Sequence, residues 1–177
     1  MPPGEAYGRV TNPERYAVLQ VGARRAVDDL AAAFDVDRTD GVDLVPRAAR
    51  SWPGARSTLL VPAGGGAPLA VVLTPFPGVA VHAGRGFAVT FPACGCDACD
   101  EQPDDLLRRL RAVLADVAAG GLIEIRRRRV LRSDRCTIRL ECADGTVSTQ
   151  TEGAFDPMAH GELPVGTTRW PGWNRRE

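Results

Sequence analysis

Two amphipathic stretches, each followed by short apolar runs, most constrain what this chain can fold into. In the first, apolar residues recur at three- and four-residue steps, which predicts a helix over Pro13–Phe34. The residues before it are typical of a helix start in which Thr11 or Asn12 is the cap. In the second stretch, acids and a proline precede an apolar stripe that a Gly-Gly pair ends, which predicts a helix over Pro103–Ala119.

The apolar runs that follow each helix are bounded by glycine, proline or Asp-Gly, a pattern typical of short strands joined by tight turns. We expect strands at Thr58–Val61, Leu69–Leu73, Val79–His82, Phe87–Phe91, Leu122–Leu131, Arg135–Cys142 and Thr146–Thr151. Turn-forming residues dominate the stretch from Asp35 to Gly54, so we expect mostly connection there, with a short strand near Val42–Val45. Glycine followed by arginine predicts a two-residue hairpin turn at Gly84-Arg85, which places His82 opposite Phe87.

The order of helix, strands, helix, strands predicts an α+β fold, with two main helices packed on a mainly antiparallel sheet of several short strands. We find no repeat and no linker, so we expect residues 1–177 to form one globular domain with an irregular tail over about 155–177. The apolar faces of the expected elements predict a core that contains Leu30, Phe34, Leu110, Val113, Val117, Cys136, Ile138 and Leu140. Trp170 and Trp173 should seal the tail onto the body, because large aromatic side chains contribute strongly to burial.

Three of the five cysteines fall within six residues, at Cys94, Cys96 and Cys99, between an expected strand end and an expected helix start. Zinc and related ions prefer thiolate ligands, and Cys-x-Cys or Cys-x-x-Cys spacing lets one turn bring sulfurs to a common ion. We therefore expect these thiols to hold a structural zinc-like ion, with their sulfurs about 3.5–4 Å apart. A closed site needs a fourth ligand, for which His82, His160 and Asp97 are the main candidates, with Cys136 and Asp100 as further ones.

Two other interpretations of the cysteine loop stay open. In the first, the loop belongs to an enzyme that uses either thiol redox chemistry or a bound metal. In the second, the three cysteines are plain free thiols. Cys96 and Cys99 form a Cys-x-x-Cys pair before a helix, where the helix dipole favours a thiolate. The acidic side chains of Asp97, Asp100 and Glu101 argue against redox chemistry, because like charges oppose a thiolate.

Composition excludes several classes of function. The 22 basic residues are all arginine and are balanced by 22 acidic residues, so no net charge attracts nucleic acid or anionic lipid. Without lysine, Schiff-base chemistry and P-loop nucleotide binding are excluded. Successive members of the run Arg126–Arg129 point to opposite faces of a strand, so we expect no nucleic-acid partner. No apolar stretch is long enough to span a membrane, and Met1–Glu5 does not resemble a signal peptide, which predicts a cytoplasmic protein.

Three segments carry a family resemblance: Tyr7–Arg15, Phe91–Glu101 with its Cys-Gly-Cys-Asp-Ala-Cys core, and Arg169–Trp173. Together they resemble a family of uncharacterised actinobacterial proteins that is catalogued as a domain of unknown function. The resemblance covers nearly the whole chain and implies a single cytoplasmic domain, but it implies no activity, substrate or catalytic residue.

Hydrolase, zincin and dinucleotide-binding motifs are absent from the sequence, and no catalytic residue can be named. We therefore expect a non-enzymatic binding or scaffold module. Its partner would be another protein.

Overall fold

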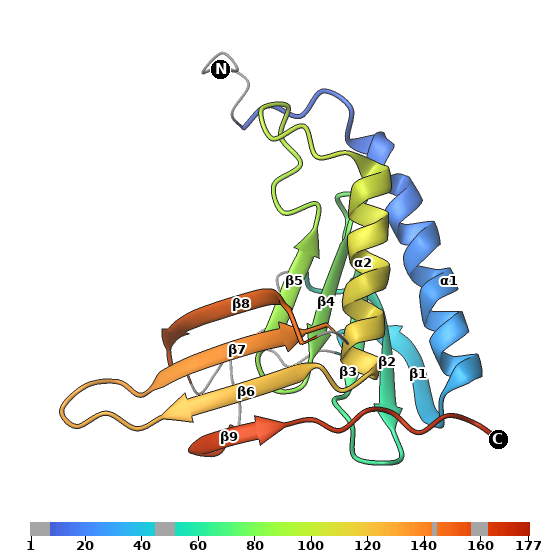
Figure 1. The fold of residues 1–177 in the computed structure, drawn as a ribbon. Helices are drawn as coiled ribbons and strands as arrows, with labels where there is room; N and C mark the ends of the chain where they lie inside the picture. The colour runs from blue at the N-terminus through green and yellow to red at the C-terminus, as the bar shows by residue number, and fades with distance from the viewer. Residues whose placement is uncertain (1–7, 45–51, 143–144, 157–162) are drawn as a thin grey trace.

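A computed structural model describes residues 8–44, 52–142, 145–156 and 163–177. Over these residues the α+β class is confirmed: α1 (Ala17–Ala33) and α2 (Pro103–Ala118) lie side by side against one face of an antiparallel sheet (Figure 1). Both expected helices are confirmed to within a residue or two, except that the first turn of the N-terminal one is a 3-10 turn, η2 (Pro13–Tyr16). Asn12 stands at the N-cap position, as expected, but its side chain makes no capping hydrogen bond.

The described strands form two antiparallel sheets. The first has the order β1-β2-β3-β4-β5, with β1 Val36–Val42, β2 Arg56–Pro62, β3 Leu69–Leu73, β4 Val79–Ala83 and β5 Phe87–Phe91. The second has the order β8-β7-β6-β9, with β6 Leu122–Arg127, β7 Arg135–Glu141, β8 Val147–Ala154 and β9 Gly166–Arg169. It begins below the C-terminal end of α2 and extends away from the first sheet (Figure 1).

The strand expected near Val42–Val45 is displaced along the chain, since β1 covers Val36–Val42 and Val45 lies outside the described residues. This strand is the edge of its sheet, and six of its seven residues are exposed. It therefore lacks the apolar alternation that marks a half-buried strand. Pairing with β2 along its whole length holds it instead.

The expected two-residue hairpin turn is wrong by one residue. The turn contains three residues, Gly84 to Gly86, so that His82 pairs with Ala88 instead of Phe87. The cause lies in the other sheet: one carboxylate oxygen of Glu124 accepts hydrogen bonds from the backbone N–H groups of Arg85 (2.9 Å) and Gly86 (2.7 Å).

Three features in the second half of the chain also differ from expectation. β6 ends at Arg127, four residues before the expected Leu131, and β8 continues to Ala154 instead of ending at Thr151. The tail is not wholly irregular, because β9 pairs with β6. The arginine-rich sequence after β6 forms the exposed loop to β7, in which the apolar side chains of Val130 and Leu131 are also exposed, so no buried face supports a longer strand.

One contiguous apolar core joins both sheets and both helices. Of the expected core residues, Leu110, Val113, Val117, Cys136, Ile138 and Leu140 are buried, whereas Leu30 and Phe34 are only partly buried against this core. Their position near the C-terminal end of α1 explains this, because that end of the helix borders solvent and the C-terminal tail. Among the described residues, neither α1 nor α2 has the length and hydrophobicity that a membrane crossing requires.

The C-terminal tail packs as the aromatic residues predicted. Trp173 is buried, its ring meets Phe34 edge-on, and its indole N–H donates to the carbonyl of Ala67 (3.1 Å). The backbone N–H of Trp173 also donates to the carbonyl of Ala118 in α2 (2.8 Å). The tail therefore connects the ends of both helices to the loop between β2 and β3.

Candidate metal centre

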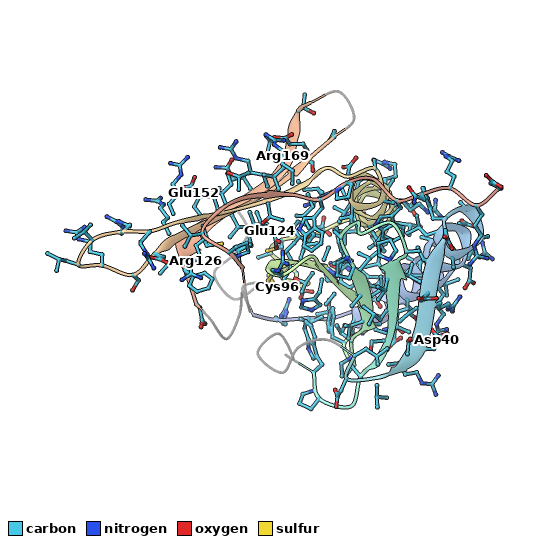
Figure 2. All side chains as sticks on the ribbon, turned by 90° about the horizontal axis from the view of Figure 1, so that it is seen from below. Asp40, Cys96, Glu124, Arg126, Glu152 and Arg169 are labelled. Atoms are coloured by element: carbon cyan, nitrogen blue, oxygen red, sulfur yellow. The ribbon has the colours of Figure 1, made fainter. Side chains whose placement is uncertain are left out.

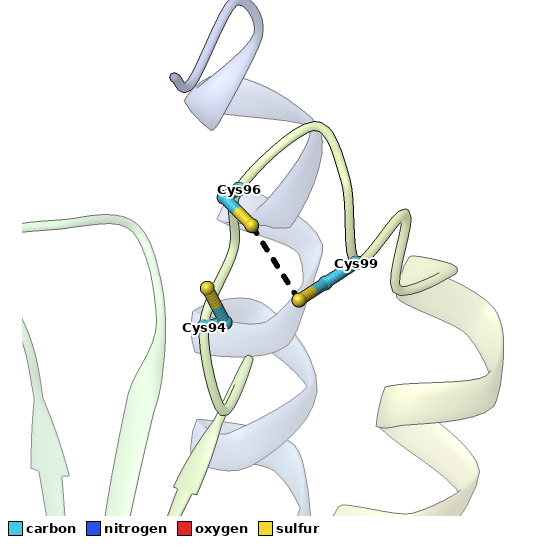
Figure 3. Close-up of side chains that lie close together, drawn as sticks. All are labelled: Cys94, Cys96 and Cys99. Carbon is cyan, nitrogen blue, oxygen red and sulfur yellow. Dashed lines mark hydrogen bonds between the residues drawn. The ribbon is translucent and has the colours of Figure 1, made fainter. Parts of the chain in front are cut away.

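The loop between β5 and α2 brings three sulfur atoms together. In Figure 3 the side chains of Cys94, Cys96 and Cys99 turn toward one another across this loop. The Sγ atoms all lie within 4.8 Å of one another, and those of Cys96 and Cys99 are 3.4 Å apart. Tetrahedral zinc–thiolate geometry places sulfurs about 3.8 Å apart, so only small movements separate this arrangement from a ligand set. Cys96 is buried, while Cys94 and Cys99 are exposed.

Asp97 joins the cysteine loop to the N-terminal segment. Its carboxylate accepts hydrogen bonds from the backbone N–H (3.0 Å) and hydroxyl (3.1 Å) of Thr11, and it pairs with the Nε of Arg9 (3.2 Å). The backbone N–H of Asp97 donates in return to the carbonyl of Arg9 (2.8 Å). Thr11 thus holds the loop instead of capping the helix.

Two further acidic side chains hold the end of the loop that precedes α2. Glu101 accepts the backbone N–H groups of Ala93 (3.4 Å) and Cys94 (3.1 Å), which closes the loop onto itself. Asp100 pairs with Arg15 of η2 at 3.3 Å. The cysteines therefore stand on a loop that is tied at both ends and to the N-terminal segment.

Hydrogen bonds among the three cysteines shift the pKa values of two of the thiols. A hydrogen bond from the thiol of Cys94, followed by those from the backbone N–H and thiol of Cys99, lowers the pKa of Cys96 to about 6. The pKa of Cys99 is raised to about 12, chiefly by the hydrogen bond between its thiol and Cys96 and next by that with Cys94. The pKa of Cys96 is thus lowered despite its acidic neighbours, each of which binds an arginine or backbone N–H groups.

Within the described residues, none of the candidate fourth ligands joins this group of sulfurs. No His, Cys, Asp or Glu in the described part of the chain joins the three thiols within the same range. The carboxylate of Asp97 binds the N-terminal segment, Asp100 pairs with an arginine, and Cys136 is buried in β7. His82 pairs with Ala88 in the first sheet, and burial lowers its pKa. His160 lies outside the described residues.

Sequence reasoning missed Arg9 and Thr11 as residues that position the loop, because no local pattern relates two segments more than 80 residues apart. It also missed Glu124, a fully buried carboxylate. In the sequence its only signal is a single acidic residue within the apolar run Leu122–Ile125.

Two arginines of the second sheet, Arg126 and Arg135, are engaged within the chain. Arg126 pairs with Asp134 (2.8 Å) and lies over the ring of Phe155, and Arg135 pairs with Glu152 (2.7 Å). Figure 2 shows Arg126 and Glu152 on the sheet that extends from the body. Because Arg126 pairs with Cys136, the neighbour of Arg135, the two arginines lie on opposite faces of the sheet, and each ion pair reduces the charge of one face.

Fold and site together define a class of protein: an α+β domain architecture in which the loop before the second helix gathers three cysteine sulfurs. The chain belongs to a family of unknown function, DUF6226, whose model matches residues 1–177. No curated protein and no solved structure matches the chain.

Proposed function

We propose that Cys94, Cys96 and Cys99 bind a zinc-like ion and that the protein is a non-enzymatic binding or scaffold module of the cytoplasm. The observation that carries the proposal is the convergence of three Sγ atoms within 4.8 Å. Thiolates favour soft and borderline ions over Mg²⁺ and Ca²⁺, which makes zinc the expected occupant.

The ties of the loop support a structural role for the ion. Asp97 and Asp100 already fix the loop to the N-terminal segment and to η2, so an ion bound by the thiols would reinforce the same junction. Because Cys94 and Cys99 are exposed, the fourth position faces solvent and is open to water or to a ligand atom from a partner.

Elemental analysis of the protein purified without chelator, paired with a count of alkylated thiols, tests this proposal. We expect about one zinc per chain and protection of the three loop thiols. Cys94→Ser, Cys96→Ser and Cys99→Ser should each lower the zinc content, whereas Cys142→Ser, which changes a thiol bonded to Asp116, should not. Metal-free protein with freely alkylated loop thiols would overturn the proposal.

The 3.4 Å separation of the Cys96 and Cys99 sulfurs favours a second candidate, reversible disulfide formation. In that reaction the two thiols lose two protons and two electrons and form one S–S bond, while an external disulfide is reduced to two thiols. Metal-free protein with a stable Cys96–Cys99 disulfide after incubation with oxidised glutathione would support this candidate over zinc.

A further inference from the structure

A cavity of about 420 Å³ lies between α1 and the floor made by β1, β2 and β3, and it shares no lining residue with the cysteine loop. Its volume falls in the range of small-molecule sites, about 300–1,000 Å³. Arg24 and Val27 of α1 form one wall. The floor follows the strand register, in which Asp40 lies opposite Thr58 and Thr58 lies opposite Val71.

The cavity contains one carboxylate, and that carboxylate is already satisfied. Asp40 accepts the Nε of Arg38 (2.9 Å) and the hydroxyl of Thr58 (2.5 Å), and its pKa is lowered by the Thr58 hydroxyl and by Arg38. Arg38 also pairs with Asp28 of α1 at 2.7 Å, which joins the helix to the edge strand beside the cavity. Asp40 lies on that edge strand in Figure 2. This cluster is therefore complete without a ligand.

Two arginines of the cavity have no such partner. Arg24 of α1 and Arg56 of β2 line the cavity, and neither forms an ion pair or side-chain hydrogen bond with another described residue. A planar guanidinium group can donate two parallel hydrogen bonds to the oxygens of a carboxylate or phosphate. Two unpaired arginines at one cavity therefore favour an anionic ligand.

Apolar side chains complete the lining. Val42, which pairs with Arg56 across the strands, is 57% exposed, and Val27 and Val71 lie deeper. An apolar surface next to unpaired cations suits a molecule with both an anionic group and a hydrocarbon part.

We propose that this cavity binds a small organic anion whose carboxylate or phosphate group contacts Arg24 and Arg56. The hydrocarbon part of the ligand lies against Val42 and Val71. The site is independent of the proposed metal centre, so either can exist without the other.

Isothermal titration calorimetry of the full chain with hexanoate, hexyl phosphate and hexylamine tests the proposal. The two anions should bind and hexylamine should not, and the tighter anion identifies the preferred head group. Arg24→Gln and Arg56→Gln should each weaken anion binding by about tenfold, as expected for the loss of a charged hydrogen bond.

Arg25→Gln is the matched control, because Arg25 is an exposed neighbour on α1 that does not line the cavity, and it should leave the affinity unchanged. A second variant, Val42→Glu, should abolish anion binding by placing a negative charge on the wall. Binding of neither anion, equal binding of hexylamine, or unchanged affinity in both arginine variants would each overturn the proposal.

Discussion

The indole N–H of Trp170 donates a hydrogen bond of 2.9 Å to the carboxylate of Glu124, which is fully buried in β6. The other carboxylate oxygen accepts the backbone N–H groups of Arg85 and Gly86. One side chain thus joins the second sheet, the hairpin of the first sheet and the part of the tail that follows β9. Figure 2 shows Glu124 in the interior of the molecule, where unsatisfied polar groups are costly.

Glu124→Ala should lower the free energy of unfolding by about 3 kcal/mol or more, because it removes the shared acceptor of three donors at a buried site. Urea denaturation followed by far-UV circular dichroism measures the change. Glu152→Ala is the control, since Glu152 forms a surface ion pair with Arg135, and it should cost less than about 1 kcal/mol. Equal losses in the two variants would contradict this role of Glu124.

Asp97→Ala should weaken zinc binding by about tenfold without removing a thiol, because residues that orient metal ligands contribute to affinity. The variant loses the bonds to Arg9 and Thr11 that hold the loop. Competition with a chromophoric zinc chelator measures the affinity. Asp104→Ala, which changes an exposed acid in the first turn of α2, should bind zinc as the wild type does.

His82 should make stability depend on pH. Burial lowers its pKa in the folded state below the ordinary value of 6.5, so the unfolded chain takes up a proton first as the pH falls. The free energy of unfolding should therefore decrease as the pH falls from 6.5 toward the pKa of His82 in the folded state. Below that pKa, His82 should cause no further decrease.

His82→Leu should flatten that part of the pH profile. The variant should also be at least as stable as the wild type at pH 7, because the buried Nε2 has no hydrogen-bond partner in the described structure. Thermal denaturation of both proteins between pH 7.5 and pH 5, at about half-unit steps, provides the comparison. Parallel profiles would show that His82 does not titrate as its burial requires.

Leu131→Gly should raise the free energy of unfolding by about 1 kcal/mol, because Leu131 has a φ of 61° that disfavours a side chain. The side chain is 99% exposed, so its removal sacrifices little packing. Val130→Gly is the control, because Val130 is 89% exposed but is not among the residues with positive φ. Glycine at this position should lower the free energy of unfolding, because it increases the conformational entropy of the unfolded chain. Chemical denaturation of both variants should show changes of opposite sign.

Elements defined by local periodicity could be predicted from the sequence. The apolar stripe of α2 and the punctuated runs Leu69–Leu73 and Phe87–Phe91 place those elements within a residue of where they lie. β1 could not be placed, because an exposed edge strand needs no apolar alternation. The cysteine loop was visible because its thiols are close in sequence, and three ligands on one short turn cannot lie far apart.

The sequence by itself therefore determined the two helices, most strands, the antiparallel character and the location of the cysteine cluster. Only the tertiary structure decided the division into two sheets, the Gly84–Gly86 turn and the attachment of Asp97 to Thr11. The same holds for the cavity between Arg24 and Arg56. The physical reason is that each of these depends on groups distant along the chain that meet only after the core has formed. A buried carboxylate such as that of Glu124 then fixes the turn whose N–H groups reach it, whatever the local sequence favours.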